Sequence, residues 1–192
     1  LYQTGVYYAF IADFEKALEL ALRAHERDPL HMPNHSTLGY VYDNLGRYEE
    51  AEAIIRKRIE IAPESFGSYA YLAHTFFFRE RYEEALEYFE QERLDGFKYA
   101  GLAAAHFMLG NQDASDDALA LLKAQQSGGW DWQLVQAHSV RGEIDEAFAA
   151  MEAAWENRDS GLTLILGDVY LKNLHNDPRY EAMVERIGLR VD

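Results

Sequence analysis

Apolar residues recur along this chain in stripes of helical spacing, separated by short polar turns, as far as about residue 157. In one stripe Leu38, Tyr42 and Leu45 follow at steps of three and four residues, which places them on one face of a helix. Glu49 and Glu50 open the next stretch, where negative charge complements a helix dipole. The pattern predicts helices over residues 2–11 and 14–27, 33–45 and 48–61, 66–79 and 82–93, 97–109 and 112–126, and 130–140 and 144–157.

The pattern also repeats itself. The segment Leu45-Gly46-Arg47-Tyr48-Glu49-Glu50-Ala51 returns 34 residues later as Arg79-Glu80-Arg81-Tyr82-Glu83-Glu84-Ala85, and 34 residues earlier part of it reads Asp13-Phe14-Glu15-Lys16-Ala17. Two weaker copies surround Gly110 and Gly142. Three copies in one register indicate a unit of two helices that is used several times.

Glycine and proline mark the ends of these helices. Gly46, Gly110 and Gly142 stand where the first helix of a pair ends and the chain reverses, a position that often needs a positive φ. Pro29 and Pro63 stop the second helices, because proline cannot continue the helical hydrogen-bond ladder. We therefore expect helical hairpins joined by tight turns.

These features resemble the tetratricopeptide repeat (TPR), over nearly the whole chain. The resemblance implies an all-α fold, a right-handed α-α superhelix of about five hairpins with a C-terminal capping helix. It implies a single domain, residues 1–192, with repeats at about 1–31, 32–65, 66–96, 97–127 and 128–159 and a cap over 160–192. The abundance of Ala and Leu relative to Val, Ile and Thr also favours helix over sheet.

The C-terminal part breaks the period. Asp177-Pro178 is a helix-start signal and Gly188 a stop, and between them lies an apolar stripe formed by Tyr180, Met183, Val184 and Ile187. A solenoid must cover its last apolar face, so we interpret this helix as the cap. The tail also resembles that of bacterial TPR arrays that follow nucleotide cyclase, winged-helix regulator or protein kinase domains. Because the chain begins with Leu1, we expect it to be a piece of a longer protein, and an enzyme domain upstream stays open.

The resemblance further implies that the first helix of each pair lines a concave face, the usual binding surface of the family. The residues predicted to line it are Tyr2, Val6, Phe10, Tyr40, Asp43, Asn44, His74, Phe77, Phe78, Phe107, Trp132 and Gln136. This lining is aromatic and nearly uncharged, so we predict a non-catalytic protein-protein interaction module that holds a peptide or protein segment through apolar or aromatic anchors. The alternative for Phe77, Phe78 and Phe107 is packing against neighbouring repeats.

A second function of a different class stays open. The aromatic residues Tyr2, Tyr7, Tyr8 and Phe10 gather at the N-terminal end, where a first repeat without a cap exposes its apolar edge. The array could then be a structural or regulatory module of a larger signalling protein, with a homodimer through the N-terminal repeat. A molar mass distinguishes the two hypotheses.

Charge and composition exclude several other functions. With 33 Asp and Glu against 18 Lys and Arg, a net charge of −15 disfavours nucleic acid and anionic membrane surfaces. No apolar run approaches the roughly 20 residues of a membrane span, and there is no cysteine for a thiolate nucleophile or metal site. No catalytic motif is found, so we predict no enzyme activity, no cofactor and no metal, and a cytoplasmic location with the periplasm as the alternative.

Two further clusters admit a functional and a structural interpretation. His74, His106 and His138 recur at intervals of 32 residues, but they replace packed aromatic positions or lie next to them, so packing is favoured over metal ligation. Arg56-Lys57-Arg58 is interpreted as the outer face of a second helix, with Arg56 paired to Glu52 and Glu60, rather than as a nucleic-acid patch.

Overall fold

The computed structural model describes residues 1–125 and 129–189. Within them, ten α-helices form five consecutive pairs and no strand occurs. The pairs are α1 (Tyr2–Phe10) with α2 (Phe14–Arg27), α3 (Met32–Asn44) with α4 (Tyr48–Ile61), α5 (Ser68–Phe78) with α6 (Tyr82–Gln91), α7 (Asp95–Met108) with α8 (Gln112–Ala124), and α9 (Asp131–Val140) with α10 (Ile144–Glu156). Two 3-10 turns, η2 (Ser160–Leu164) and η3 (Val169–Leu171), and the helix α11 (Pro178–Ile187) follow.

The helix ends follow the signals in the sequence, and each predicted end within the described residues lies within two residues of the observed one; the predicted end at residue 126 lies outside the described residues. Gly46, Gly110 and Gly142 have φ angles of 70°, 77° and 74°, as expected for a chain reversal after the first helix of a pair. Where glycine is missing at this turn, Ala12 and Glu80 take φ angles of 58° and 59°. The geometry of the hairpin therefore holds even where the residue type does not favour it.

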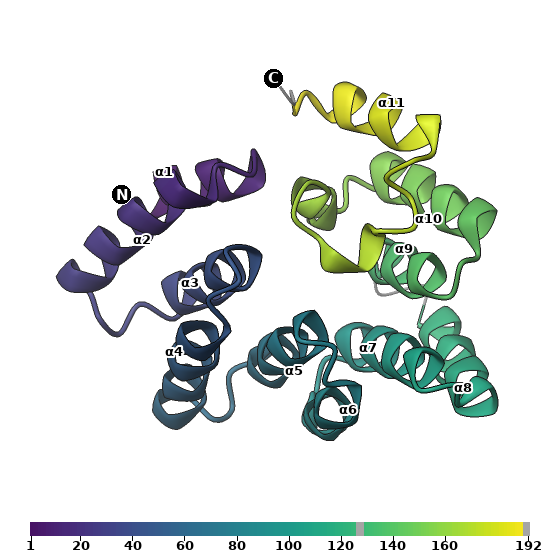
Figure 1. Cartoon of the computed structure of the whole chain (residues 1–192), viewed down its shortest axis with the longest axis horizontal. Coiled ribbons are helices and arrows are strands. Elements are labelled where there is room, and N and C mark those ends of the chain that lie inside the picture. The colour runs from purple at the N-terminus through teal and green to yellow at the C-terminus, as the bar shows by residue number, and fades with distance from the viewer. Residues whose placement is uncertain (126–128, 190–192) are drawn as a thin grey trace.

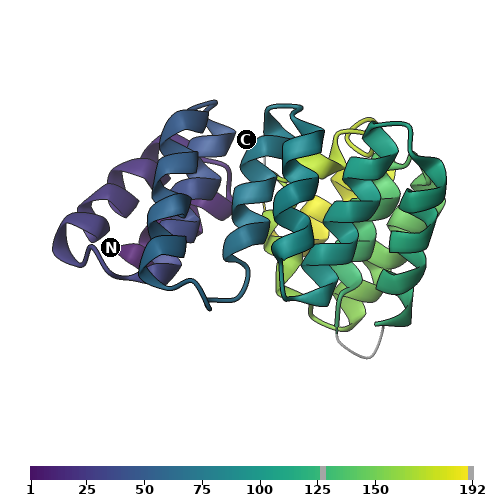
Figure 2. The same ribbon diagram turned by 90° about the horizontal axis from the view of Figure 1, so that it is seen from below.

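The five hairpins stack side by side along an arc (Figure 1). The first helices α1, α3, α5, α7 and α9 contact one another in sequence along the inner side, and each packs against its own second helix on the outer side. Seen from below, the helices run side by side as a continuous row (Figure 2). Small residues permit this close stacking: a Cβ at Gly39 would lie 2.7 Å from Ile55 Cδ1, and Ala51, Ala85 and Ala147 are fully buried.

The last helix, α11, covers the outer end of the row, which confirms the predicted capping helix. Its Met183 and Val184 belong to the same buried cluster as Phe148 and Met151 of α10. Between α10 and α11, however, the chain does not follow the arc. Residues 159–175, called the return segment below, fold back onto the inner side, where η3 contacts α9 (Figure 1).

Arg58 corrects one prediction. We expected it on the outer face of α4, but its side chain is buried, at 7% exposure. Position 58 faces the start of α3 and the loop after α4, where oxygen acceptors gather. The guanidinium donates to the hydroxyls of Ser36, Ser65 and Ser68 at 2.8–2.9 Å and to the backbone oxygens of Met32 and Phe66 at 2.6 and 3.3 Å. A buried cation with its donors satisfied is a structural clamp.

Arg56 follows the prediction in part. Its guanidinium donates to Glu52 at 2.8 Å, the four-residue spacing expected on a helix. Its other partner is the hydroxyl of Tyr88 in the next hairpin, at 3.0 Å, rather than Glu60. No helix in the two described stretches combines the length and the apolar character that crossing a bilayer requires.

Candidate partner-binding groove

The inner side of the array is divided into a filled half and an open half by the return segment. In the filled half, the Asp168 carboxylate lies over α9. Its Oδ2 accepts hydrogen bonds from Trp132 Nε1 at 3.0 Å and from Gln136 Nε2 at 2.7 Å, and its Oδ1 accepts one from the Tyr170 backbone nitrogen at 3.0 Å. Asp168 therefore satisfies, from within the chain, the side-chain donors that Trp132 and Gln136 direct to this face.

Further contacts hold the return segment along its length. Ser139 Oγ donates to the backbone oxygen of Tyr170 at 2.8 Å, and Asn173 donates to the backbone oxygen of Ser139 at 2.8 Å. The Tyr170 ring stacks on Phe77 of α5, with centroids 4.3 Å apart, and meets His74 edge to face at 5.2 Å. The segment thus bridges α9 and α5 across the groove.

Two glycines allow the segment to approach this closely. A Cβ at Gly161 would overlap the Trp132 ring, and one at Gly167 would overlap Tyr40 Oη and lie 2.8 Å from Phe14 Cζ. Gly167 therefore brings the segment as far as α2 and α3, on the other arm of the arc. A larger residue at either position would force the segment away from the helices.

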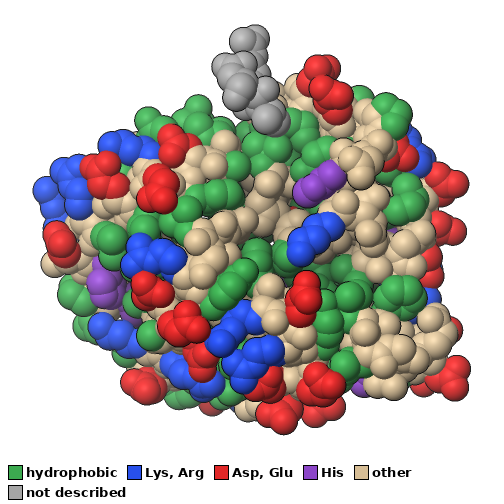
Figure 3. Space-filling view, in the orientation of Figure 1, with side chains coloured by type: hydrophobic (Ala, Val, Ile, Leu, Met, Phe, Trp, Pro, Cys, Tyr) green, Lys and Arg blue, Asp and Glu red, His purple; other side chains and the backbone are tan. Residues whose placement is uncertain are grey.

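The open half is a hollow of about 790 Å³ between α1 and α3 on one side and the return segment on the other, and its wall also includes parts of α5 and α9. We call it the N-terminal hollow. In the space-filling view, hydrophobic side chains lie between the two arms, with charged side chains around the rim (Figure 3). Its aromatic and aliphatic lining includes Tyr2, Val6, Phe10, Tyr40, Tyr71, Phe78, Trp130, Leu164 and Val169.

A second, smaller hollow of about 490 Å³ lies on the other side of the return segment. Asn44 and Tyr48 line it from the first arm, and Lys172 and His175 line it from the segment itself. Gly167, Asp168 and Val169 line both hollows, as do Asp43 and Phe78. The return segment is therefore the wall that separates them.

Burial governs the ionisation of the groove. Desolvation raises the pKa of Asp43 to about 8, although a hydrogen bond from Thr75 Oγ1, at 2.9 Å from Oδ2, opposes the shift. Desolvation raises the pKa of Asp168 to about 6 only, since Gln136, the Tyr170 backbone and Trp132 all stabilise its charged form. Desolvation also lowers the pKa of His74 to about 4, which leaves this ring neutral near pH 7.

Comparison with known proteins agrees with this geometry. The family model of the tetratricopeptide repeat matches residues 35–65, which span most of α3, all of α4 and part of the loop that leads to α5. Over 96% of this chain and 97% of the other, the fold is similar to the crystal structure of TTC0263, a thermophilic TPR protein of Thermus thermophilus, with a TM-score of 0.64 and 20% identity. Residues 35–65 thus match a tetratricopeptide repeat, and the chain as a whole has the fold of a TPR array.

Two further solved structures resemble the TPR array. MamA matches with a TM-score of 0.53 and 16% identity over 93% of each chain. BtubC (BKLC) from P. vanneervenii matches with a TM-score of 0.50 and 19% identity, over 95% of this chain and 89% of that one. None of the curated proteins compared matches the sequence. TPR folds commonly mediate protein-protein interaction, and the family that matches is a repeat family, not an enzyme family.

The structure divides the twelve residues predicted to line the groove of the TPR array. Trp132, Phe77 and Gln136 are buried beneath the return segment, at 0%, 6% and 7% exposure, although Trp132 and Gln136 also form part of the wall of the N-terminal hollow. The physical reason is that the chain fills this part of its own groove. Phe107 is not among the residues that line either hollow. The Arg141 guanidinium lies 5.7 Å from the centre of its ring. The remaining eight line one hollow or both: Tyr2, Val6, Phe10, Tyr40, Asp43, Asn44, His74 and Phe78.

The sequence analysis missed the contribution of the return segment, above all Asp168, Leu164 and Val169. No helical period marks these residues, so they could not be assigned to a face. The sequence did contain one signal, the two aspartates Asp159 and Asp168. In the structure each accepts a hydrogen bond from the backbone nitrogen two residues later, at Gly161 (2.8 Å) and Tyr170 (3.0 Å). Such local aspartate turns are typical of a tight, ordered connection rather than of a simple linker.

Proposed function

We propose that this TPR array is a non-catalytic interaction module that binds a short peptide or protein segment in the N-terminal hollow. The observation that carries the proposal is the hollow itself, where Tyr2, Phe10 and Tyr40 keep partly exposed faces opposite Leu164 and Val169. A concave surface that is mostly apolar and of this volume is the usual form of a ligand site. Apolar or aromatic anchors of the partner would replace water over these rings.

The return segment limits what such a partner can be. A ligand that follows the inner side from α1 to α9 meets Tyr170 and Asp168, which already occupy the surface of α5 and α9. The proposed ligand is therefore a short segment held between the first two hairpins and the return segment, as an extended strand or a single helical turn or two.

Selection from a random dodecapeptide display library on the folded chain tests this proposal. We expect selected peptides to be rich in Leu, Phe, Tyr and Trp, because the lining offers apolar and aromatic contacts. Val6→Arg, which places a long cation in the hollow, should weaken their binding at least tenfold. The matched control is Leu121→Arg on the outer helix α8, where the leucine is exposed and the same change is far from the groove.

Thermal unfolding of both variants confirms that they are folded. The proposal fails if no peptide is enriched, or if Val6→Arg and Leu121→Arg bind the selected peptides equally well.

Assembly through the first repeat is the alternative function, and exposed apolar residues favour it. Tyr7 is 58% exposed, and Leu1 and Leu22 of the same hairpin are also exposed. Exposed apolar residues on the first hairpin of this array are available to a second copy. The molar mass measured by light scattering distinguishes the two functions. A dimer that Tyr7→Ser converts to a monomer supports assembly, whereas a monomer that binds the selected peptides supports peptide binding in the groove.

A further inference from the structure

Three buried oxygens beside the N-terminal hollow have no hydrogen-bond partner within the described residues: Asp43 Oδ1, Tyr40 Oη and Tyr170 Oη. Asp43 is only 5% exposed, and of its two carboxylate oxygens only the other one is bonded, to Thr75. Buried polar groups are nearly always paired, because an unpaired one loses its hydration without compensation. These atoms therefore mark a place that can accept hydrogen bonds from outside the chain.

The three groups belong to one neighbourhood. All of them line the N-terminal hollow, from α3 on one side and from the return segment on the other. Burial raises the pKa of both tyrosines, the charge of Asp168 adds to both shifts, and the charge of Asp43 adds to that of Tyr170. Tyr40 and Asp43 lie three residues apart on α3, and Gly167, the residue before Asp168, packs against Tyr40 Oη, so these groups share one end of the hollow.

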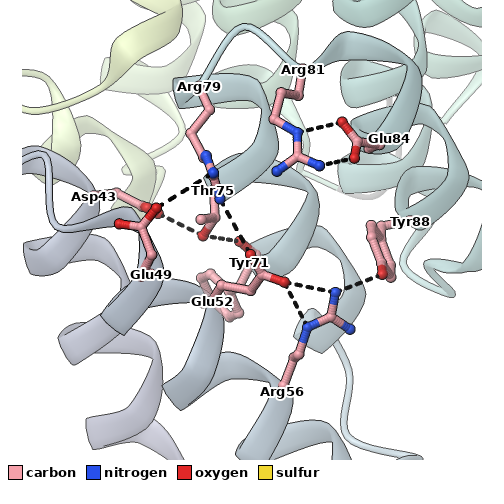
Figure 4. Close-up of polar contacts among 10 residues, drawn as sticks. All are labelled: Asp43, Glu49, Glu52, Arg56, Tyr71, Thr75, Arg79, Arg81, Glu84 and Tyr88. Carbon is pink, nitrogen blue, oxygen red and sulfur yellow. Dashed lines mark hydrogen bonds and ion pairs between the residues drawn. The ribbon is translucent and has the colours of Figure 1, made fainter.

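The cations of the chain near this site are already engaged. Arg58, which also lines the hollow, donates to five oxygens of its own surroundings. Arg79 lies near Asp43, but its guanidinium is directed to Glu49 at 3.5 Å and Glu52 at 3.3 Å, as Figure 4 shows. His74 is neutral near pH 7. Among the described lining residues the site thus offers acceptors without a matching positive charge.

We propose that the N-terminal hollow selects partner segments with a basic side chain, whose ammonium or guanidinium group binds Asp43 and the hydroxyl of Tyr40. This inference rests on the proposed function and names the ligand chemistry for that site. A charge-assisted hydrogen bond would supply the partner that Asp43 Oδ1 lacks, and the surrounding aromatic rings would contribute cation-π attraction. The net charge of −15 would in addition attract basic segments from a distance.

The test uses two small probes that differ in charge and little else. 2-Phenylethylammonium carries an aromatic ring and a cation, and 2-phenylethanol carries the same ring and a neutral hydroxyl. Each is titrated into the folded chain at pH 8.5, above the pKa of about 8 of Asp43, so that this carboxyl is ionised while the amine is still protonated, and binding is followed by backbone amide NMR shifts. We expect the ammonium to bind at least tenfold more tightly than the alcohol, with the largest shifts in α3 and around residues 167–170.

Asp43→Asn is the decisive variant, because an asparagine keeps an acceptor for Thr75 while it removes the charge. It should weaken ammonium binding at least tenfold and change alcohol binding less than twofold. Asp117→Asn on α8 makes the same change in net charge at an exposed position and should leave both unchanged. If Asp43→Asn does not fold, Tyr40→Phe replaces it, with an expected loss of about threefold for the ammonium alone, since it removes one of the two acceptors.

Equal binding of the two probes, absence of binding by either, or a charge preference that survives in Asp43→Asn would overturn the inference. Failure of this inference is separable from failure of the proposed function. Apolar peptides without a basic residue that still lose binding in Val6→Arg would preserve the groove and refute the cation site.

Discussion

The two halves of the inner face are built from equivalent helices, yet one is a core and the other is a surface. On α9 every residue from Trp132 to Val140 is buried, because hairpin partners cover one side and the return segment covers the other. On α3 the equivalent stripe keeps Ser36, Tyr40 and Asn44 partly exposed. The binding surface of a repeat array is thus set by what the rest of the chain leaves uncovered, and not by the repeat alone.

Two aspartates express the same difference in their chemistry. Asp168, in the filled half, accepts three hydrogen bonds, and its pKa is raised to about 6. Asp43, in the open half, accepts one hydrogen bond from a side chain, and its pKa is raised to about 8. Both carboxyls are buried, so the number of donors separates them. A carboxylate whose hydrogen-bond donors all come from the chain is part of the interior. A carboxylate with an unpaired oxygen can accept a donor from a ligand.

The largest expected effect is on stability, and it contrasts Trp132 with Phe10. Trp132→Ala removes a fully buried indole and the donor to Asp168, so we expect a loss of about 3–5 kcal/mol in the free energy of unfolding. Phe10→Ala removes a partly exposed ring at the edge of the open half and should cost about 1 kcal/mol or less. Urea unfolding at pH 7 measures both. Similar losses for the two variants would show that the halves are not different in packing.

Most of the array could be predicted from the sequence, because its period is a property of local spacing. Leu38 and Tyr42 lie on one helix as predicted, Leu45 is the C-cap residue of that helix, and the turn glycines have the positive φ that their position suggested. Each of these features depends on residues a few positions apart. The local pattern is therefore enough to predict each hairpin, and its repetition is enough to predict that the hairpins stack in sequence.

The candidate site was less predictable, because its state depends on residues far apart in the sequence. Gln136 and Asp168, 32 residues apart, determine that the C-terminal half is filled, and nothing in the spacing of either residue indicates their contact. Arg58 was assigned to the outer face for the same reason, since its partners come from three other segments. A polar residue within an apolar stripe, such as Gln136 or Ser139 of α9, is the kind of signal that could have suggested a buried partner.

The next effect is a dependence of stability on pH that belongs to the open half. The pKa of Asp43 is raised in the folded chain, so the folded state holds this proton more strongly than the unfolded state. Its contribution to stability is complete below about pH 4 and is lost as the pH rises through about 8. For Asp168 the corresponding loss ends near pH 6.

Asp43→Asn isolates this contribution, because the other titrating groups are common to both proteins. Between pH 6.5 and 8.5 we expect the free energy of unfolding of the natural chain to fall, relative to the variant, by about 1–3 kcal/mol, the range for a buried polar group without a full set of partners. Urea unfolding at the two pH values gives the difference. Parallel pH profiles for the two proteins would show that Asp43 ionises freely and that the open half is not desolvated at this point.

The smallest expected effect concerns how firmly the return segment is attached. It distinguishes the two halves of the inner face by the rate of hydrogen exchange in each. The Tyr180 hydroxyl on α11 donates to the backbone oxygen of the buried Ile165 at 2.7 Å, so it ties the cap to the filled half. Tyr180→Phe removes one hydrogen bond and should cost about 0.5–1.5 kcal/mol. Because local opening follows local stability, hydrogen exchange at the Tyr170 amide should accelerate by about twofold to tenfold, while amides of α3 stay unchanged.

Tyr7→Phe, which removes an exposed hydroxyl in the first hairpin, is the matched control and should alter neither region. Unchanged exchange at Tyr170 in Tyr180→Phe would mean that α9 alone holds the segment, through Asp168, and that the cap takes no part in closing this half of the groove.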